Sequence, residues 1–183
     1  QSAHTDTAIA VELNTGNLGG NTVVWSLKKD GGETALADAV LGELATDGGT
    51  VLFKQKGNYT LTATITDELG KIIAATDFIT IYPVAEVTLS LPAVSHTDKT
   101  VTLKTETKEA DGLEFTYTLT KNGEPVEINA IIEGKLADDA IRFKEKGVYA
   151  LTAFVTDVTG RVFADTANIT VYPVGSAGFY LPE

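Results

Sequence analysis

The sequence repeats itself, and this repeat constrains the fold more than any other feature. Residues 53–84 (FKQKGNYTLTATITDELGKIIAATDFITIYPV) recur 90 residues later as residues 143–174 (FKEKGVYALTAFVTDVTGRVFADTANITVYPV), with 18 of 32 positions identical and no gap. The preceding parts of the two copies also align, at a spacing of 92. In a chain of 183 residues this pattern predicts two small domains with separate cores, residues 1–84 and 85–174. Residues 175–183 are then a tail or the start of a following module.

Composition excludes several classes of partner. The chain has 14 Lys and Arg against 25 Asp and Glu, a net charge of -11, which disfavours nucleic acid and anionic membrane surfaces. No apolar run approaches the roughly 18 residues of a membrane helix, so we expect no membrane insertion. Cysteine is absent and only two histidines are present, which excludes disulfides and makes a zinc site improbable.

Both copies show apolar residues at every second position, the period of a half-buried strand. In the best-conserved stretch the predicted inward set is Tyr59, Leu61, Ala63 and Ile65, with threonines between them. An earlier strand in each copy places Trp25 and Tyr117 at equivalent positions, and both are predicted core aromatics. Six or seven such strands per copy, with almost no helical periodicity, predict an all-β chain of two antiparallel β-sandwiches.

Turn residues separate the predicted strands. Asp30-Gly31 and Asn122-Gly123 are pairs that accept positive φ and predict tight hairpins. The segments 33–47 and 125–139 are ambiguous between a helical turn and a strand, and we favour a short strand followed by a loop. The first copy has two extra residues around Gly49 and Thr50, and a length change of this kind predicts a surface loop.

A resemblance to a known family rests on three features of each copy. These are a strand with a buried aromatic residue, a glycine-containing turn, and the run KGxYxLTxxxTDxxG followed by a strand ending in Tyr-Pro-Val. Together they resemble PKD domains and related bacterial immunoglobulin-like modules, although Ser26-Leu27 stands where PKD domains usually have Asp-Phe. The resemblance implies an immunoglobulin-like sandwich in an extracellular or cell-surface protein, used as a spacer, an adhesion unit or an accessory to a secreted enzyme.

Candidate functional residues are few. Tyr59 and Tyr149 each follow a glycine and lie on the inward phase, which favours a structural tyrosine corner over a sugar-stacking platform. His4 and His96 begin equivalent His-Thr-Asp motifs that we interpret as turns. Turn carboxylates such as Asp67 and Asp157 leave calcium open as a minor alternative, but no calcium-loop motif is present, so no cofactor is expected. Exposed aromatics at which the copies differ, or which flank the junction, are the candidate interface residues: Phe78, Tyr82, Phe154 and Tyr172.

The junction and the end of the chain share one more pattern. Residues 82–92 read YPVAEVTLSLP, without glycine, and predict a short, stiff connection between domains placed end to end. Residues 175–183 align with residues 85–93 as far as a shared Leu-Pro, so the sequence is expected to be cut from a longer array, or to supply the first strand of a following module. The expected function is a non-catalytic stalk or adhesion module of a bacterial surface or secreted protein, whose partners are neighbouring domains. The alternative is a module that binds glycan or protein through loops and exposed aromatics.

Overall fold

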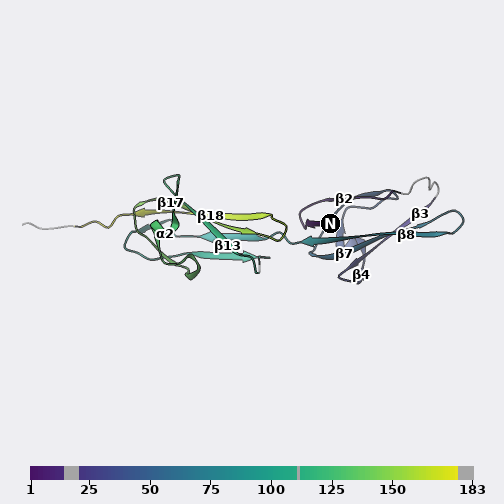
Figure 1. Cartoon of the computed structure of the whole chain (residues 1–183), viewed down its shortest axis with the longest axis horizontal. Helices are drawn as coiled ribbons and strands as arrows, with labels where there is room; N and C mark the ends of the chain where they lie inside the picture. The colour runs from purple at the N-terminus through teal and green to yellow at the C-terminus, as the bar shows by residue number, and fades with distance from the viewer. Residues whose placement is uncertain (15–20, 111, 177–183) are drawn as a thin grey trace, which may run out of the picture. The chain divides into compact units, whose positions relative to one another are not determined.

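A computed structural model describes residues 1–14, 21–110 and 112–176. The chain divides into two compact units, unit 1 (Gln1–Val84) and unit 2 (Ala85–Glu183). Both are built almost entirely of strands joined by short turns (Figure 1). Helical segments among the described residues are limited to one turn each: α1 (Leu36–Ala39), α2 (Ile128–Ile131) and the 3-10 turn η1 (Leu136–Asp138). The predicted all-β fold is confirmed.

Unit 1 consists of two sheets. The larger sheet has the strand order β1-β8-β7-β3-β4 and the smaller one β2-β6-β5. The strands are β1 (Ser2–His4), β2 (Ile9–Glu12), β3 (Thr22–Lys29), β4 (Gly32–Thr34), β5 (Val40–Leu41), β6 (Gly48–Phe53), β7 (Gly57–Thr66) and β8 (Ile72–Tyr82). All pairs are antiparallel except β1 with β8, which is parallel.

Unit 2 repeats this plan and adds a strand at its start. Its larger sheet has the order β10-β18-β17-β13-β14, and its second layer contains the groups β11-β16-β15 and β12-β9. The strands are β9 (Glu86–Ser90), β10 (Val94–His96), β11 (Val101–Thr102), β12 (Lys104–Lys108), β13 (Phe115–Lys121), β14 (Glu124–Val126), β15 (Ile132–Glu133), β16 (Ala140–Phe143), β17 (Gly147–Thr156) and β18 (Val162–Tyr172). The parallel pair recurs between β10 and β18, so the prediction of a purely antiparallel sandwich needs this correction.

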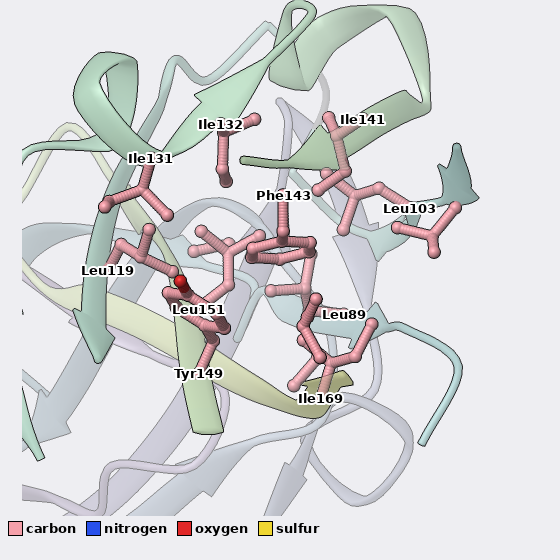
Figure 2. Close-up of a cluster of buried hydrophobic side chains, with 14 residues drawn as sticks. Leu89, Leu103, Leu119, Ile131, Ile132, Ile141, Phe143, Tyr149, Leu151 and Ile169 are labelled. Carbon is pink, nitrogen blue, oxygen red and sulfur yellow. The ribbon is translucent and has the colours of Figure 1, made fainter. Parts of the chain in front are cut away.

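The cores lie between the layers and follow the predicted period of two. Tyr59, Ala63 and Ile65 of β7 are buried, as are Tyr149, Leu151, Ala153 and Val155 of β17. Figure 2 shows the core of unit 2, where Leu151 and Ile169 of the larger sheet meet side chains from the opposite layer, such as Ile141 and Phe143 of β16. Pro83 and Pro173 directly follow the last strand of each unit, because proline has no N–H for a sheet hydrogen bond.

The hairpin turns form as the sequence predicts. Asp30 and Asn122 adopt φ of 50° and 51°, and the glycines after them are also left-handed, which defines two-residue turns with the twist of a hairpin. Each turn residue has a second role: Asp30 Oδ1 accepts the Asn58 N–H at 2.9 Å, and Asn122 Oδ1 accepts the Val148 N–H at 3.0 Å. These side chains tie the β3–β4 and β13–β14 hairpins to the next strand of their sheet.

The tyrosines of the repeated stretch make the hydrogen bond of a tyrosine corner. The Tyr59 hydroxyl donates to the Gln55 carbonyl, and the Tyr149 hydroxyl donates to the Glu145 carbonyl, each at 2.9 Å. Burial raises the pKa of both phenols; Asp30 adds to the rise for Tyr59, while for Tyr149 Lys121 opposes it and Glu145 adds to it. Gly57, at φ 151°, lets the chain enter β7 here, since a Cβ would lie 2.8 Å from the Lys29 Cε.

Two local predictions were wrong. The segments 33–47 and 125–139 share a short strand, a helical turn and a second short strand instead of a strand and a loop, and 125–139 has the further 3-10 turn η1. The ammonium groups of Lys54 and Lys144, in the bends that follow β6 and β16, donate to the Ala37 and Asn129 carbonyls inside these turns. The extra residues around Gly49 lie within β6 and lengthen its pairing with β2 instead of forming a loop.

Candidate interaction groove

Unit 1 has an open groove between its two layers. It has a volume of about 370 Å³ and is lined by β2, by the middle of β7 and by the middle of β8, with Trp25 and Phe53 among its walls. Most of the lining is apolar, including Val11, Leu61 and Ile79, and the charged side chains are Glu12 and Asp77. We call this feature the unit 1 groove.

Both rims of the unit 1 groove are unpartnered strand surfaces. β2 is the outermost strand of the smaller sheet and pairs only with β6, so its other backbone edge is open. The first part of β8 presents its inward-phase residues without cover: Ile73 is 42% exposed, and Ala75 and Asp77 are also exposed. An open backbone edge beside an uncovered apolar face is the arrangement to which a further strand adds.

Unit 2 shows what fills the equivalent space. There β9 pairs antiparallel with β12, with Leu89 opposite Thr105 and Ser90 opposite Lys104. Leu89 is 5% exposed and belongs to the core cluster that includes Leu103 and Ile169, as Figure 2 shows. The Leu89 N–H also donates to Asp165 Oδ2 of β18 at 2.8 Å, which fixes β9 against the opposite sheet. The described part of unit 1 contains no strand at this place.

Residues at equivalent positions of the two units are more buried in unit 2, where β9 is present, than in unit 1. Leu103 and Leu151 of unit 2 are fully buried, whereas their counterparts Val11 and Leu61 are half-buried. Ala167 is buried under β9, and the residue at its position in unit 1 is the exposed Asp77. The unit 1 groove is therefore the site that β9 occupies in unit 2, left open.

The candidate interface residues of unit 1 both lie on β8. Phe78 is 65% exposed and lines the rim of the groove, as the sequence comparison of the two copies suggested for an interface. Tyr82 lies four residues further on, about 13 Å along the strand, half-buried and with its ring 6.1 Å from that of His4. Only Phe78 of these two belongs to the groove.

The candidate interface residues of unit 2 lie apart from one another. Phe154 is half-buried on the outward phase of β17, where it pairs with Ala164 of β18. Tyr172 is 51% exposed at the end of β18, eight residues or about 26 Å beyond Ala164, with its ring 6.1 Å from that of His96. These two aromatics form no common site.

Trp25 and Tyr117, the predicted core aromatics, point inward but are only half-buried. The Trp25 Nε1–H donates to the Ala45 carbonyl at 2.8 Å, and one face of the side chain lines the unit 1 groove. Tyr117 stacks on Phe115 with ring centroids 6.1 Å apart and lines a shallow hollow beside α2 and η1. The prediction was correct in phase and wrong in the degree of burial, because each residue sits near the margin of its core.

The predicted turn residues are engaged in backbone contacts. Asp67 Oδ1 accepts the N–H groups of Leu69 and Lys71, and Asp157 Oδ1 accepts those of Thr159 and Arg161. Backbone hydrogen bonds from Thr7 to His4 and from Lys99 to His96 close the His-Thr-Asp turns. In the described ranges no three His, Cys, Asp or Glu residues gather as metal ligands do, and no helix is long and apolar enough to cross a membrane.

Comparisons with known proteins identify the fold. The sequence matches no family model and no curated protein sequence. Among solved structures, the chain is similar to the extracellular domains 3–5 of Drosophila OTK, with TM-score 0.52 and 17% identity over 94% of this chain and 59% of that one. It is also similar to the insect immune protein hemolin, with TM-score 0.57 and 15% identity over 95% of this chain and 44% of that one. Down syndrome cell adhesion molecule matches over 82% of this chain and 21% of its own, with TM-score 0.50 and 12% identity.

These structures consist of tandem immunoglobulin-like domains, and the two units of this chain have the immunoglobulin-like fold, as predicted. The chain spans less than two thirds of the length of each of these structures. Sequence reasoning identified Phe78 but missed the groove beside it. The available signal was the segment 85–93, whose alternating apolar residues stand directly before the second His-Thr-Asp motif.

Proposed function

We propose that this chain is a non-catalytic adhesion or structural module of a bacterial cell-surface or secreted protein, with PKD-like immunoglobulin domains in tandem. Its partners are protein segments and neighbouring domains of its own polypeptide. The observation that supports this most is the unit 1 groove, a surface shaped for a β-strand and formed by an open backbone edge and apolar side chains. Of the similar structures, DSCAM is by name a cell adhesion molecule, which accords with the proposal.

The repeated residues support a structural role. The positions that the two copies share include the tyrosine corners, the turn aspartates and the buried strand residues, and all of these are engaged in holding the fold. One carboxylate oxygen of Asp67 and one of Asp157 accept backbone N–H groups, which supports a structural role for these turns. The proposal therefore includes no resident cofactor, and treatment with a calcium chelator is expected to leave the unfolding transitions unchanged.

The alternative is a glycan-binding module, and the exposed ring of Phe78 at the groove rim is the observation that favours it. A glycan array probed with the whole chain, together with a panel of general hydrolase substrates, separates the two functions. The proposed function predicts no turnover and no saturable glycan signal. Saturable glycan binding that Phe78→Ala or Phe154→Ala abolishes, and that the control Phe115→Tyr retains, would replace the proposal with the alternative.

A further inference from the structure

We infer that the unit 1 groove takes residues 175–183 of a second copy of this chain as an added β-strand, so that copies associate head to tail. This rests on the proposed function as a module that contacts protein segments. The occupant follows from unit 2, where β9 fills the equivalent space directly after a Tyr-Pro-Val sequence at residues 82–84. The same Tyr-Pro-Val occurs at residues 172–174, directly before residues 175–183.

The tail aligns with the strand it would replace at a shared Leu-Pro. Residues 85–93 read AEVTLSLPA and residues 175–183 read GSAGFYLPE, with the Leu-Pro in register. Ala177, Phe179 and Leu181 take the positions of Val87, Leu89 and Leu91, the apolar phase of β9, while Tyr180 stands on the other phase where β9 has Ser90. A strand with this alternation presents one apolar face to the groove.

Two wall positions of the groove differ from unit 2 in opposite directions. Leu103, which lies in one core cluster with Leu89, is replaced in unit 1 by the smaller Val11. The buried Ala167 is replaced by the larger Asp77. Phe179 is larger than Leu89, so the room for its ring is on the Val11 side of the groove.

The backbone of the added strand also finds partners. In unit 2 the strand pairs with β12, and transfer of that register places Tyr180 opposite Glu12, the last residue of β2, and Phe179 opposite Leu13. Asp165, which accepts the Leu89 N–H, is replaced by Ala75, but Asp77 stands two residues further along β8 on the same face. Asp77 supplies a carboxylate in the groove for a backbone N–H. Residues 175–182 carry no charged side chain, so no like charge opposes Asp77 or Glu12.

Sedimentation velocity of the whole chain over a range of concentrations, at physiological salt to screen the net charge, tests this inference. We expect species larger than one chain that grow with concentration. Phe179→Asp in the tail and Ala75→Arg in the groove should each weaken association at least about tenfold, since each places a charge at an apolar contact. The control Val158→Asp adds the same charge as the tail variant at a residue that is 76% exposed in the β17–β18 turn, and it should associate as the unaltered chain does.

A synthetic peptide of residues 175–183 should compete with association and bind the Phe179→Asp chain, whose groove is intact. Chains that remain monomeric up to about 1 mM, or association that Phe179→Asp leaves unchanged, would overturn the inference. It would also be overturned if a peptide of residues 85–93 bound the groove and the peptide of residues 175–183 did not. That result would retain the proposed function, whereas saturable binding in the glycan array would remove the proposed function whatever the association state.

Discussion

The two units of this chain have the same core plan and differ in one strand. Unit 2 has β9, which pairs with β12 and buries Leu89 between the sheets; the described part of unit 1 has an open groove at that place. The shared features, such as the tyrosine corner, the hairpin turns and the Tyr-Pro-Val ends, are present in both. In unit 2 this strand covers the side of the sandwich that the groove leaves uncovered in the described part of unit 1.

The largest expected effect comes from removing the side chain that closes unit 2. Leu89→Ala deletes buried methyl groups from a packed cluster and should lower the free energy of unfolding of unit 2 by about 2–5 kcal/mol. Chemical denaturation followed by far-UV circular dichroism measures this change. Phe179→Ala is the matched control, because at dilute concentration its residue should contribute nothing to unit 2. Equal losses of unfolding free energy in the two variants would mean that Leu89 of β9 does not stabilise the core of unit 2.

The tyrosine corners should contribute equally to the two units. Tyr59→Phe and Tyr149→Phe each remove one hydroxyl donor to a backbone carbonyl and should each cost about 1 kcal/mol in the unit that carries the change. Denaturation of both single variants and of the double variant tests this, and additive losses are expected because the sites belong to separate cores. A loss confined to one unit would show that the corner serves the closed sandwich alone.

The same tyrosines predict the response to high pH. Their pKa values are raised by burial, so the folded chain holds the phenol protons more tightly than the unfolded chain does. This contribution is complete below the ordinary tyrosine pKa of about 10 and is lost as the pH rises through the raised folded values. Stability measured from pH 8 upward by denaturation should therefore fall from about pH 10, and less steeply in the Tyr59→Phe, Tyr149→Phe double variant. If stability fell equally steeply in the unaltered chain and in the double variant, titrating groups other than Tyr59 and Tyr149 would be responsible for the loss of stability.

The smallest expected effect concerns a charged pair beside the tyrosine corners. Lys121 pairs with Glu145 in unit 2, whereas Lys29 donates to the neutral Gln55 at 2.7 Å in unit 1. The hydrogen bond from Lys121 lowers the pKa of Glu145, so any stabilisation is present above the ordinary pKa of about 4.5 and is lost as pH falls through the lowered value. The attraction between Lys121 and Glu145 weakens as salt is added, so unit 2 should be slightly more stable at low salt. Glu145→Gln should remove this gain, and the denaturation midpoint of both chains at two ionic strengths measures it. An unchanged salt dependence would show that the pair is not its source.

Most of the fold was predictable because local rules and tertiary structure agree in it. The alternation around Tyr59, the Asp30-Gly31 turn and the proline after Tyr82 each specify one conformation without reference to distant residues. The helical turns α1 and α2 were not predictable from local sequence, because they receive hydrogen bonds from the ammonium groups of Lys54 and Lys144, more than ten residues away along the chain. The period of two correctly predicted that Trp25 points inward. It does not predict how far Trp25 is buried, because that depends on whether a neighbouring strand covers the side chain.

The candidate site was predictable only in part, for a related reason. Phe78 stood out because its counterpart in the second copy is Asn168, and it does lie at the groove rim. The groove itself depends on the absence of a strand from the side of β2, and residues such as Val11 and Leu61 look like ordinary core positions in sequence. Phe154 showed the same difference between the copies, and Tyr172 was chosen because it flanks the junction. The two do not gather at a site, because exposure alone does not bring residues together.

The measurement that tests this account most directly uses Trp25, which is the single tryptophan and lines the groove of unit 1. Unfolding of the Phe179→Asp chain is followed by Trp25 fluorescence with and without a peptide of residues 85–93, the strand that closes unit 2. The account predicts that the peptide raises the midpoint of the Trp25 transition, because binding to the folded state adds to the stability of unit 1, and that the rise grows with the logarithm of the peptide concentration above Kd. The unit 2 transition is expected to stay in place. A Trp25 transition that does not respond to the peptide at any concentration would contradict the claim that the unit 1 groove is an open strand site.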